Sequence, residues 1–291
     1  MSNKPETKKM TLTIGGKIVE IETGKYAKQA TSSVTVKCNG TMLFVHATVS
    51  KEPRVGIDFF PLLIDYEERM SAVGKIPGGY TRTEGKSSEK AILVSRLIDR
   101  PIRPLWPKGY RNDVQIVSQL FAYDEEEQPD ILSIIGASAA LMISGAPFEG
   151  PVGAVRVGRI DGQFVANPTH SEDLKSDMNI VIAGTKESVI MVEAGCKFVS
   201  EDDIMNAVEF AQVEIRKQCD AQLEFAKACG VVKEEFVNPY DTSELAKIIE
   251  ETAHDMIFDA YHNFDRVYRQ EKLEEAKKLV KEKVEALPED H

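Results

Sequence analysis

Two tight-turn dipeptides near the N-terminus, Gly15-Gly16 and Asn39-Gly40, place the strongest constraint on the fold. Residues of these types readily adopt the positive φ angles of two-residue hairpin turns. Runs rich in β-branched residues flank both turns, at residues 11–14, 17–21, 33–38 and 41–50. The first part of the chain is therefore predicted to form antiparallel strands.

Strand and helix patterns alternate along the next part of the chain. An apolar run at 59–64 leads through a glycine-rich loop at 74–85 into a helix over 89–99, which Ser87 or Ser88 caps and Pro101 ends or bends. Further patterns predict a strand at 114–123, a helix of small residues at 131–144, strand pairs at 152–160 with 163–166 and 179–183 with 188–193, and a helix at 201–229. This order predicts an α+β fold.

The composition changes after Gly230. From Ser243 onward only amphipathic helical patterns occur, at residues 245–261 and 270–287. We therefore expect two domains, at 1–230 and 231–291. The second is a small all-helical domain, expected to be incomplete and docked on another part of a protein because it is too polar for a large core of its own.

Several classes of protein are disfavoured. The chain has no apolar run long enough for a membrane span and no signal-peptide core, so we expect a cytoplasmic protein without membrane contact. Its four cysteines and five histidines show no metal-ligand spacing. No motif indicates a catalytic nucleophile, a nucleotide-binding glycine loop or a bound cofactor. We expect neither catalytic nor metal-binding residues in this chain.

Charge is distributed unevenly. The whole chain carries a net charge of −11, which disfavours a polyanionic partner. Residues 75–111, however, hold nine basic and three acidic side chains, a local charge of +6 that leaves −17 on the remainder. A basic patch on an acidic body still attracts anions locally.

The glycine-rich loop at 74–85 is a candidate binding site for single-stranded nucleic acid. Tyr80 offers a face on which a base can stack, and Arg82 and Lys86 offer charges for phosphates. An ordinary solvated surface loop is the alternative.

Three arginines follow on the next helix and just beyond it. Arg96 and Arg100 share one helix face, and Arg103 follows Pro101. Their planar guanidinium groups suit phosphate oxygens. Internal ion pairs, for example with Asp99, would explain the same residues equally well.

Three segments resemble one known family. FFPLLIDYEERMSAVGKIPGGYTRTEG, RLIDRPIRPLWP and DILSIIGASAALMISGAPFEGPVGAVRVG closely resemble the first RNase PH-like domain of bacterial and organellar polynucleotide phosphorylases. The resemblance covers residues 8–291. It implies an RNase PH-like fold (ribosomal protein S5 domain 2-like) followed by the family's all-helical domain, and a trimeric ring around an RNA channel.

The resemblance also implies an activity. The family degrades single-stranded RNA from the 3′ end with phosphate, releasing nucleoside diphosphates, and uses magnesium or manganese. It places catalysis in a second RNase PH-like domain, which this sequence lacks, along with the KH and S1 domains. We therefore expect this chain alone to be inactive and to need no cofactor of its own. In the full enzyme it is expected to guide RNA, to form part of the homotrimer and to contact other RNA-degradation proteins.

The channel loop departs from the family pattern. That pattern has two aromatic residues followed by two basic ones, and it aligns with Tyr80, Thr81, Arg82 and Thr83. Only the first aromatic and the first arginine remain, which predicts a weaker grip on RNA. Lys86, where the family often has arginine, keeps the charge but not the planar fork.

Three hypotheses of function follow. The first is the RNA-guiding part of a phosphorolytic exoribonuclease, with Tyr80, Arg82, Thr83, Lys86, Arg96, Arg100 and Arg103 as RNA-binding residues. The second is a non-catalytic RNA-binding or assembly module. The third is a stand-alone exoribonuclease that acts on transfer RNA ends, against which the helical tail and the missing catalytic aspartates argue.

Overall fold

The computed structural model describes residues 6–80, 82–238 and 243–285, and the chain divides into two compact units, Met1–Phe236 and Val237–His291. The boundary thus lies beyond the one expected at residue 230. Residues after Gly230 belong to the first unit because they bond to it. The Glu234 amide donates to the Gly145 carbonyl at 2.8 Å, and the Phe236 ring lies 5.3 Å from that of Tyr110.

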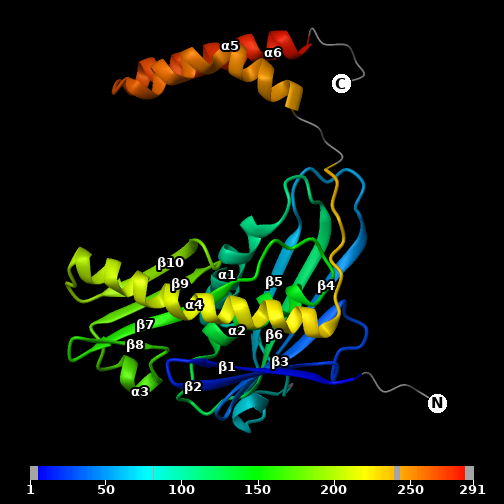
Figure 1. The fold of residues 1–291 in the computed structure, drawn as a ribbon, viewed down its shortest axis with the longest axis vertical. Helices are drawn as coiled ribbons and strands as arrows, with labels where there is room; N and C mark the ends of the chain where they lie inside the picture. Colours follow the sequence, from blue (N-terminus) through cyan, green and yellow to red (C-terminus); the bar gives the residue numbers. More distant parts are fainter. Residues whose placement is uncertain (1–5, 81, 239–242, 286–291) are drawn as a thin grey trace. The chain divides into compact units, whose positions relative to one another are not determined.

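A six-stranded sheet forms one layer of the first unit (Figure 1). Its order is β1-β2-β3-β4-β6-β5, with bounds β1 Lys8–Ile14, β2 Lys17–Thr23, β3 Ser32–Cys38, β4 Thr41–Pro53, β5 Leu62–Glu68 and β6 Asn112–Ala122. All neighbours pair antiparallel except β5 and β6. Gly15, Gly16 and Asn39 have positive φ angles in the two turns, so both predicted hairpins are confirmed.

A four-stranded antiparallel sheet forms the second layer. Its order is β10-β9-β7-β8, with bounds β7 Gly153–Ile160, β8 Gln163–Ala166, β9 Met178–Gly184 and β10 Val189–Cys196. Asp161 and Gly162 take φ angles of 50° and 77° between β7 and β8. The strand pairs predicted in this region are therefore confirmed.

Helix α2 (Pro129–Met142) lies between the two sheets and is buried along its whole length. It packs on β3, β4 and β6 on one side and on β7 on the other. The small residues predicted to permit close approach do so at Gly136, where a Cβ atom would lie 2.8 Å from a methyl carbon of Val36 and of Val45.

Helix α1 (Glu89–Ile102) packs against β5, α2 and β10. Ser88 caps it by accepting a hydrogen bond from the Ala91 amide at 3.0 Å. The sequence predicted that Pro101 ends or bends the helix. The helix ends at Ile102, one residue after Pro101, and the Arg103 amide still bonds the Asp99 carbonyl. Only the hydrogen bond that Pro101 itself cannot donate is lost. The short 3₁₀ helix η2 (Arg103–Leu105) continues the chain.

Helix α4 (Glu201–Cys229) has the predicted bounds and runs along β1, β7 and β9. Ser200 caps its start, and Gly230, with φ 70°, ends it. Two buried glutamines fasten it to β7. Gln218 exchanges two hydrogen bonds with the backbone of Ala154, and Gln222 donates to the Val152 carbonyl.

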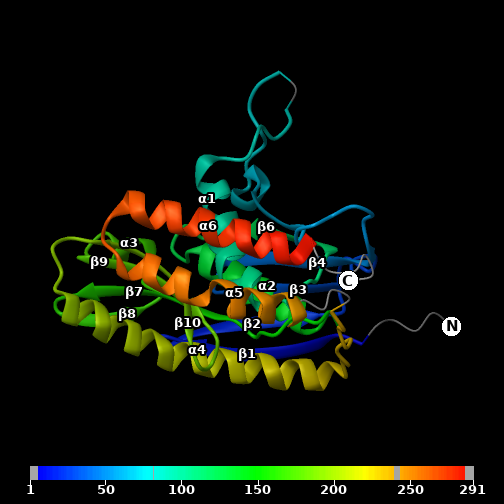
Figure 2. The same cartoon turned by 90° about the horizontal axis from the view of Figure 1, so that it is seen from above.

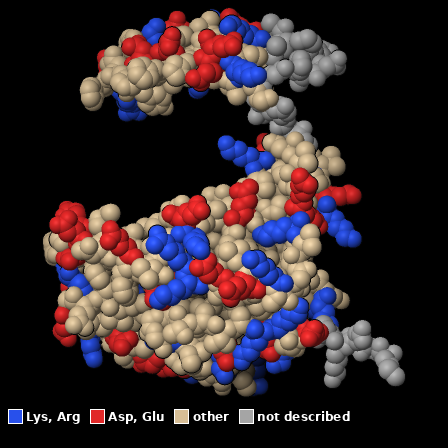
Figure 3. All heavy atoms as spheres, in the orientation of Figure 1, with Lys and Arg blue, Asp and Glu red and all other residues tan. Residues whose placement is uncertain are grey.

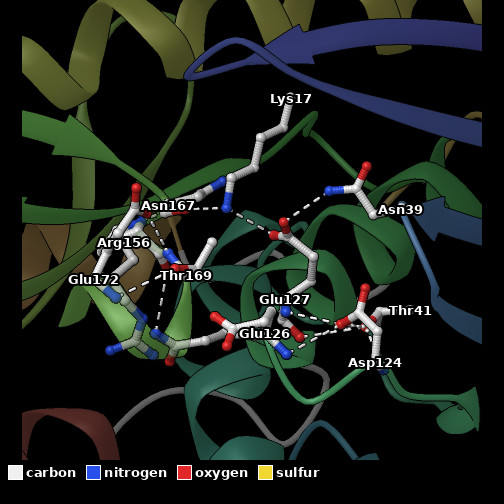
Figure 4. Close-up of polar contacts among 12 residues, drawn as sticks. Lys17, Asn39, Thr41, Asp124, Glu126, Glu127, Arg156, Asn167, Thr169 and Glu172 are labelled. Carbon is white, nitrogen blue, oxygen red and sulfur yellow. Dashed lines mark hydrogen bonds and ion pairs between the residues drawn. The ribbon is translucent and has the colours of Figure 1, made fainter. Parts of the chain in front are cut away.

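A network of polar side chains holds the ends of the hairpins against the acidic turn after β6 (Figure 4). Glu127 accepts from Lys17 and from Asn39, each at 2.9 Å. Asp124 accepts from the Thr41 hydroxyl and from the Gly40 amide, also at 2.9 Å. The acidic turn therefore supports the fold. The short helices η1 (Met70–Val73) and α3 (His170–Asp173) complete the unit.

The second unit is a pair of helices, α5 (Ser243–His262) and α6 (Arg266–Glu285). Both predicted helices are present, although the end of the second prediction, residues 286 and 287, lies outside the described residues. In the described residues, no helix is long and apolar enough to cross a membrane.

Candidate nucleic-acid interface

The loop between η1 and α1 projects from the first unit (Figure 2). Tyr80 is fully exposed, with a relative accessibility of 103%, and makes its ring face available to a base. Arg82, Thr83 and Lys86 are also exposed. Thr81 lies outside the described residues. The loop thus exposes one aromatic side chain and two cations, which agrees with the predicted RNA-binding loop and equally with the alternative of a solvated surface loop.

The base of this loop is fixed. The Met70 amide donates to the Glu84 carboxylate at 3.0 Å, and the Lys75 amide donates to the Met70 carbonyl at 3.0 Å. Gly74 ends η1 with a φ angle of 70°. Of these, the bond from Met70 to Glu84 joins the two ends of the loop, so Tyr80 and Arg82 lie between linked ends.

The three arginines of the α1 region differ in their surroundings. Arg96 is exposed, and the described residues show no ion pair or hydrogen bond for its guanidinium group. Arg100 donates to the Glu193 carboxylate of β10 and reaches the Val192 carbonyl at 3.5 Å. Arg96 is therefore more accessible to an anion than Arg100.

Arg103 is engaged within the fold. It contacts both carboxylate oxygens of Asp99, at 2.8 and 3.0 Å, and donates to the Leu62 carbonyl at 3.1 Å. This is the internal ion pair that the sequence left open as an alternative. Arg103 fastens the end of α1 to β5, and its side chain remains 43% exposed.

A groove of about 720 Å³ lies between α1 and the strands β9 and β10. Arg96 and Arg100 line it together with Lys90, and the buried Arg156 of β7 contributes to it from the sheet. Arg156 donates to Asp130 and to Asn179, and Asn179 donates to Asp173 at 3.0 Å. The sequence reasoning missed Lys90, Asp130, Arg156 and Asn179 as neighbours of the arginines. An arginine within the apolar run 152–157 was the signal that could have pointed to a buried polar site.

Basic and acidic side chains are interspersed on the face seen in Figure 3. In the groove the basic ones are in excess, because Lys90, Arg96, Arg100 and Arg156 face two carboxylates, Asp130 and Glu193. Negative charge in a ligand would therefore be favoured here. No cluster of three or more His, Cys, Asp and Glu side chains suited to a metal ion occurs within residues 6–80, 82–238 and 243–285.

Comparisons with known sequences give a consistent result. Residues 16–147 match domain 1 of the 3′ exoribonuclease family, and residues 150–214 match domain 2. The chain is 48% identical over 277 residues to a polyribonucleotide nucleotidyltransferase of Heliobacterium modesticaldum, covering 95% of this chain and 39% of that protein. It is 52% identical over 227 residues to the corresponding protein of Moorella thermoacetica, covering 77% of this chain and 30% of that one. The chain thus spans well under half the length of these relatives.

The fold is also found among solved structures. Rice Rrp46 matches with a TM-score of 0.57 at 11% sequence identity, over 77% of this chain and 96% of that one. This likeness confirms the predicted RNase PH-like fold.

Proposed function

Because the chain belongs to the 3′ exoribonuclease family and corresponds to part of the polyribonucleotide nucleotidyltransferases, as its motifs predicted, we propose that it guides single-stranded RNA within a phosphorolytic 3′-to-5′ exoribonuclease. In that reaction an oxygen of inorganic phosphate attacks the phosphorus of the last phosphodiester. The bond to the 3′ oxygen of the preceding nucleotide breaks, that oxygen takes a proton, and a nucleoside diphosphate leaves. The activity serves the turnover of messenger RNA.

The exposed loop is the observation that supports this role most directly. Tyr80 is fully exposed at an anchored turn, beside the exposed cations of Arg82 and Lys86. An aromatic face contributes roughly 1–3 kcal/mol for each base that stacks on it, and it does so for every base type. Such a loop suits an enzyme that must pass RNA of any sequence.

Catalysis is proposed to reside outside this chain. The chain covers only 30–39% of the length of the relatives named above. Asp130 is held by Arg156, and Asp173 is held by Asn179, so neither has a free set of oxygens for a cation. The magnesium or manganese of the reaction, and its phosphate, would bind in a second RNase PH-like domain.

The same proposal includes the assembly. The chain would form part of a homotrimeric, cytoplasmic enzyme that meets other RNA-degradation proteins. Within the trimer the loop that carries Tyr80 would line the RNA path, with Arg82, Thr83 and Lys86 beside it and Arg96 and Arg100 further along. Arg103 would act mainly by holding α1 in place, given its bonds to Asp99 and Leu62.

Two measurements on the 291-residue chain test this function. The first is a binding titration with single-stranded RNA, and the second is release of nucleoside diphosphates in the presence of phosphate and magnesium or manganese. Binding that weakens in Tyr80→Ala, without diphosphate release, is the expected result. Diphosphate release by this chain alone would place an active site within it, and an absence of RNA binding would contradict the guiding role.

A further inference from the structure

The groove between α1 and the β9–β10 hairpin has the size and lining of a small-molecule site. Its volume of about 720 Å³ lies within the range of roughly 300–1,000 Å³ that is usual for ligand pockets. Three kinds of surface meet in it: the basic side chains of α1, an apolar wall and a buried polar floor. Each supplies a different part of a binding site.

The basic side of the groove comes from one face of α1. Arg96 and Arg100 are one helical turn apart, so their guanidinium groups project from neighbouring positions on that face. Arg96 has no ion pair in the part of the chain that the structure describes. The exposed Lys90 lies at the same groove, with its amine 3.9 Å from Glu68, at the outer limit of an ion pair. This side therefore offers uncompensated positive charge.

The floor is polar but already balanced. Arg156 is only 8% exposed, and its terminal nitrogens donate to Asp130 and Asn179. Its Nε atom is buried and lacks a hydrogen-bond partner among the described residues. Because Asp130 neutralises the charge of Arg156, the attraction for an anion comes from the α1 side, and the floor supplies fixed polar groups.

The remaining wall is apolar. Leu93 and Leu97 of α1 line the groove together with Val181 of β9. Leu93 is 57% exposed, so part of its side chain is open to a ligand in the groove. A flat apolar group, such as a nucleobase, would cover this surface.

We propose that this groove binds a nucleoside diphosphate. Arg96 and Arg100 hold the two phosphates, and the base lies against Leu93 and Leu97. Two guanidinium groups within one helical turn can each pair with a different phosphate of one small ligand. The choice of a nucleoside diphosphate among small anions rests on the function proposed above, since it is the product of that reaction. The groove would then sense product.

The Glu193 carboxylate competes with a bound diphosphate for Arg100. It occupies Arg100 in the absence of ligand, and both side chains are at least half exposed. A diphosphate must displace this carboxylate to reach Arg100. Replacing Glu193 with glutamine removes the competing charge without removing a side chain, so ligand should bind more tightly to Glu193→Gln.

Calorimetric titration of the full 291-residue chain with ADP tests the site, with AMP and inorganic phosphate as separate arms. ADP should bind more tightly than either. Arg96→Ala should weaken ADP binding about tenfold or more, because a charge-assisted contact is lost. Arg216→Ala, which removes an exposed arginine on α4 outside the groove, should bind ADP as the parent chain does.

A second variant tests the space in the groove without changing its charged side chains. Gly195→Trp keeps every cation and adds a bulky ring at the groove, on the same sheet face as Glu193 and Val181, where an added Cβ atom meets nothing within 4 Å. ADP binding should therefore be lost while the unfolding transition stays in place. Unchanged ADP affinity in both Arg96→Ala and Gly195→Trp, or no ADP binding by the folded parent chain, would overturn the site. RNA binding without ADP binding rejects the groove alone, whereas ADP binding without RNA binding rejects the RNA-guiding function alone.

Discussion

Arg156 of β7 and Asp130 at the start of α2 form a buried ion pair, with side chains only 10% and 13% exposed. The pair joins the four-stranded sheet to the central helix. Asn179 of β9 accepts a second hydrogen bond from the same guanidinium group. Two charges that share one buried site neutralise each other, but removal of either leaves the other without compensation.

Breaking this pair should destabilise the first unit strongly. Arg156→Met and Asp130→Asn should each lower the free energy of unfolding by about 3–5 kcal/mol, measured by urea denaturation. The double variant should lose clearly less than the sum of the two single losses, because it leaves no unpaired charge. Arg216→Met serves as the control for loss of an arginine and should change stability by less than about 0.5 kcal/mol. A loss below 1 kcal/mol in both single variants would show that the pair is not buried as described.

A methyl group added at Gly136 should destabilise the fold. Gly136→Ala should lower the free energy of unfolding by about 1–2 kcal/mol, because overpacking outweighs the gain in helix propensity. Val45→Ala should cost stability as well, by opening a cavity. Combined, the two should cost less than their sum, since the contact with Val45 is then relieved and only that with Val36 remains. Strict additivity in a denaturation experiment would mean that the methyl group of Val45 does not limit the approach.

The cluster of Arg159, Asp177 and Asp203 predicts a pH effect. Arg159 contacts both carboxylates at 2.7 Å. Its hydrogen bonds lower the pKa of Asp177, and hydrogen bonds from Ser200 and Arg159 lower the pKa of Asp203. Carboxyl groups with a lowered pKa stabilise the folded state above their unfolded pKa of about 4 and lose that contribution as the pH falls through the folded values.

The stability difference between the parent chain and Arg159→Gln should therefore be fully present above about pH 5 and should shrink as the pH falls below about 4, through the lowered folded pKa values of Asp177 and Asp203. Urea denaturation at several pH values measures it. Lys217→Gln, which removes a pair with Glu214 on α4, provides a comparison at an exposed surface bridge. If the stability difference between the parent chain and Arg159→Gln stayed constant as the pH fell well below about 4, the carboxylates would not carry the effect.

The exposed loop predicts an RNA effect without a stability effect. Tyr80→Ala should weaken binding of single-stranded RNA by about 1–3 kcal/mol. Arg82→Ala should make the plot of log affinity against log salt concentration less steep, by about the amount that one phosphate contact contributes. Neither should move the unfolding midpoint, because both side chains are exposed. Phe198→Ala, at another fully exposed aromatic residue, should leave RNA affinity unchanged. Equal losses in Tyr80→Ala and Phe198→Ala would indicate unspecific hydrophobic binding.

Local patterns predicted most of the elements. The hairpin at Gly15-Gly16 was readable because the turn chemistry and the flanking strands agree, and helix α4 was readable from Ser200 at its start and Gly230 at its end. Tyr80 and Arg82 could be selected from the loop because exposure follows from glycine content and polarity. These features depend on residues close together in the chain.

Features that depend on distant residues could not be predicted. The groove brings α1 against β10, which lies about ninety residues further along, as the contact of Arg100 with Glu193 shows. From the sequence, the Arg103 side chain could have pointed into solvent or paired with Asp99. The packing at the end of α1 determines that it pairs with Asp99. The first unit extends to Phe236, beyond the boundary expected at residue 230, because the Phe236 ring packs against that of Tyr110. Local composition does not reveal this contact.

The complete burial of α2 has a consequence for folding. The helix belongs to the segment that matches family domain 1, yet it also packs on β7 of the segment that matches domain 2. Neither sheet alone can shield it from water, so the two matched segments form a single cooperative folding unit. Backbone amides of α2 should exchange with solvent only when the whole unit opens, and a cut between residues 147 and 150 would not yield two independent domains.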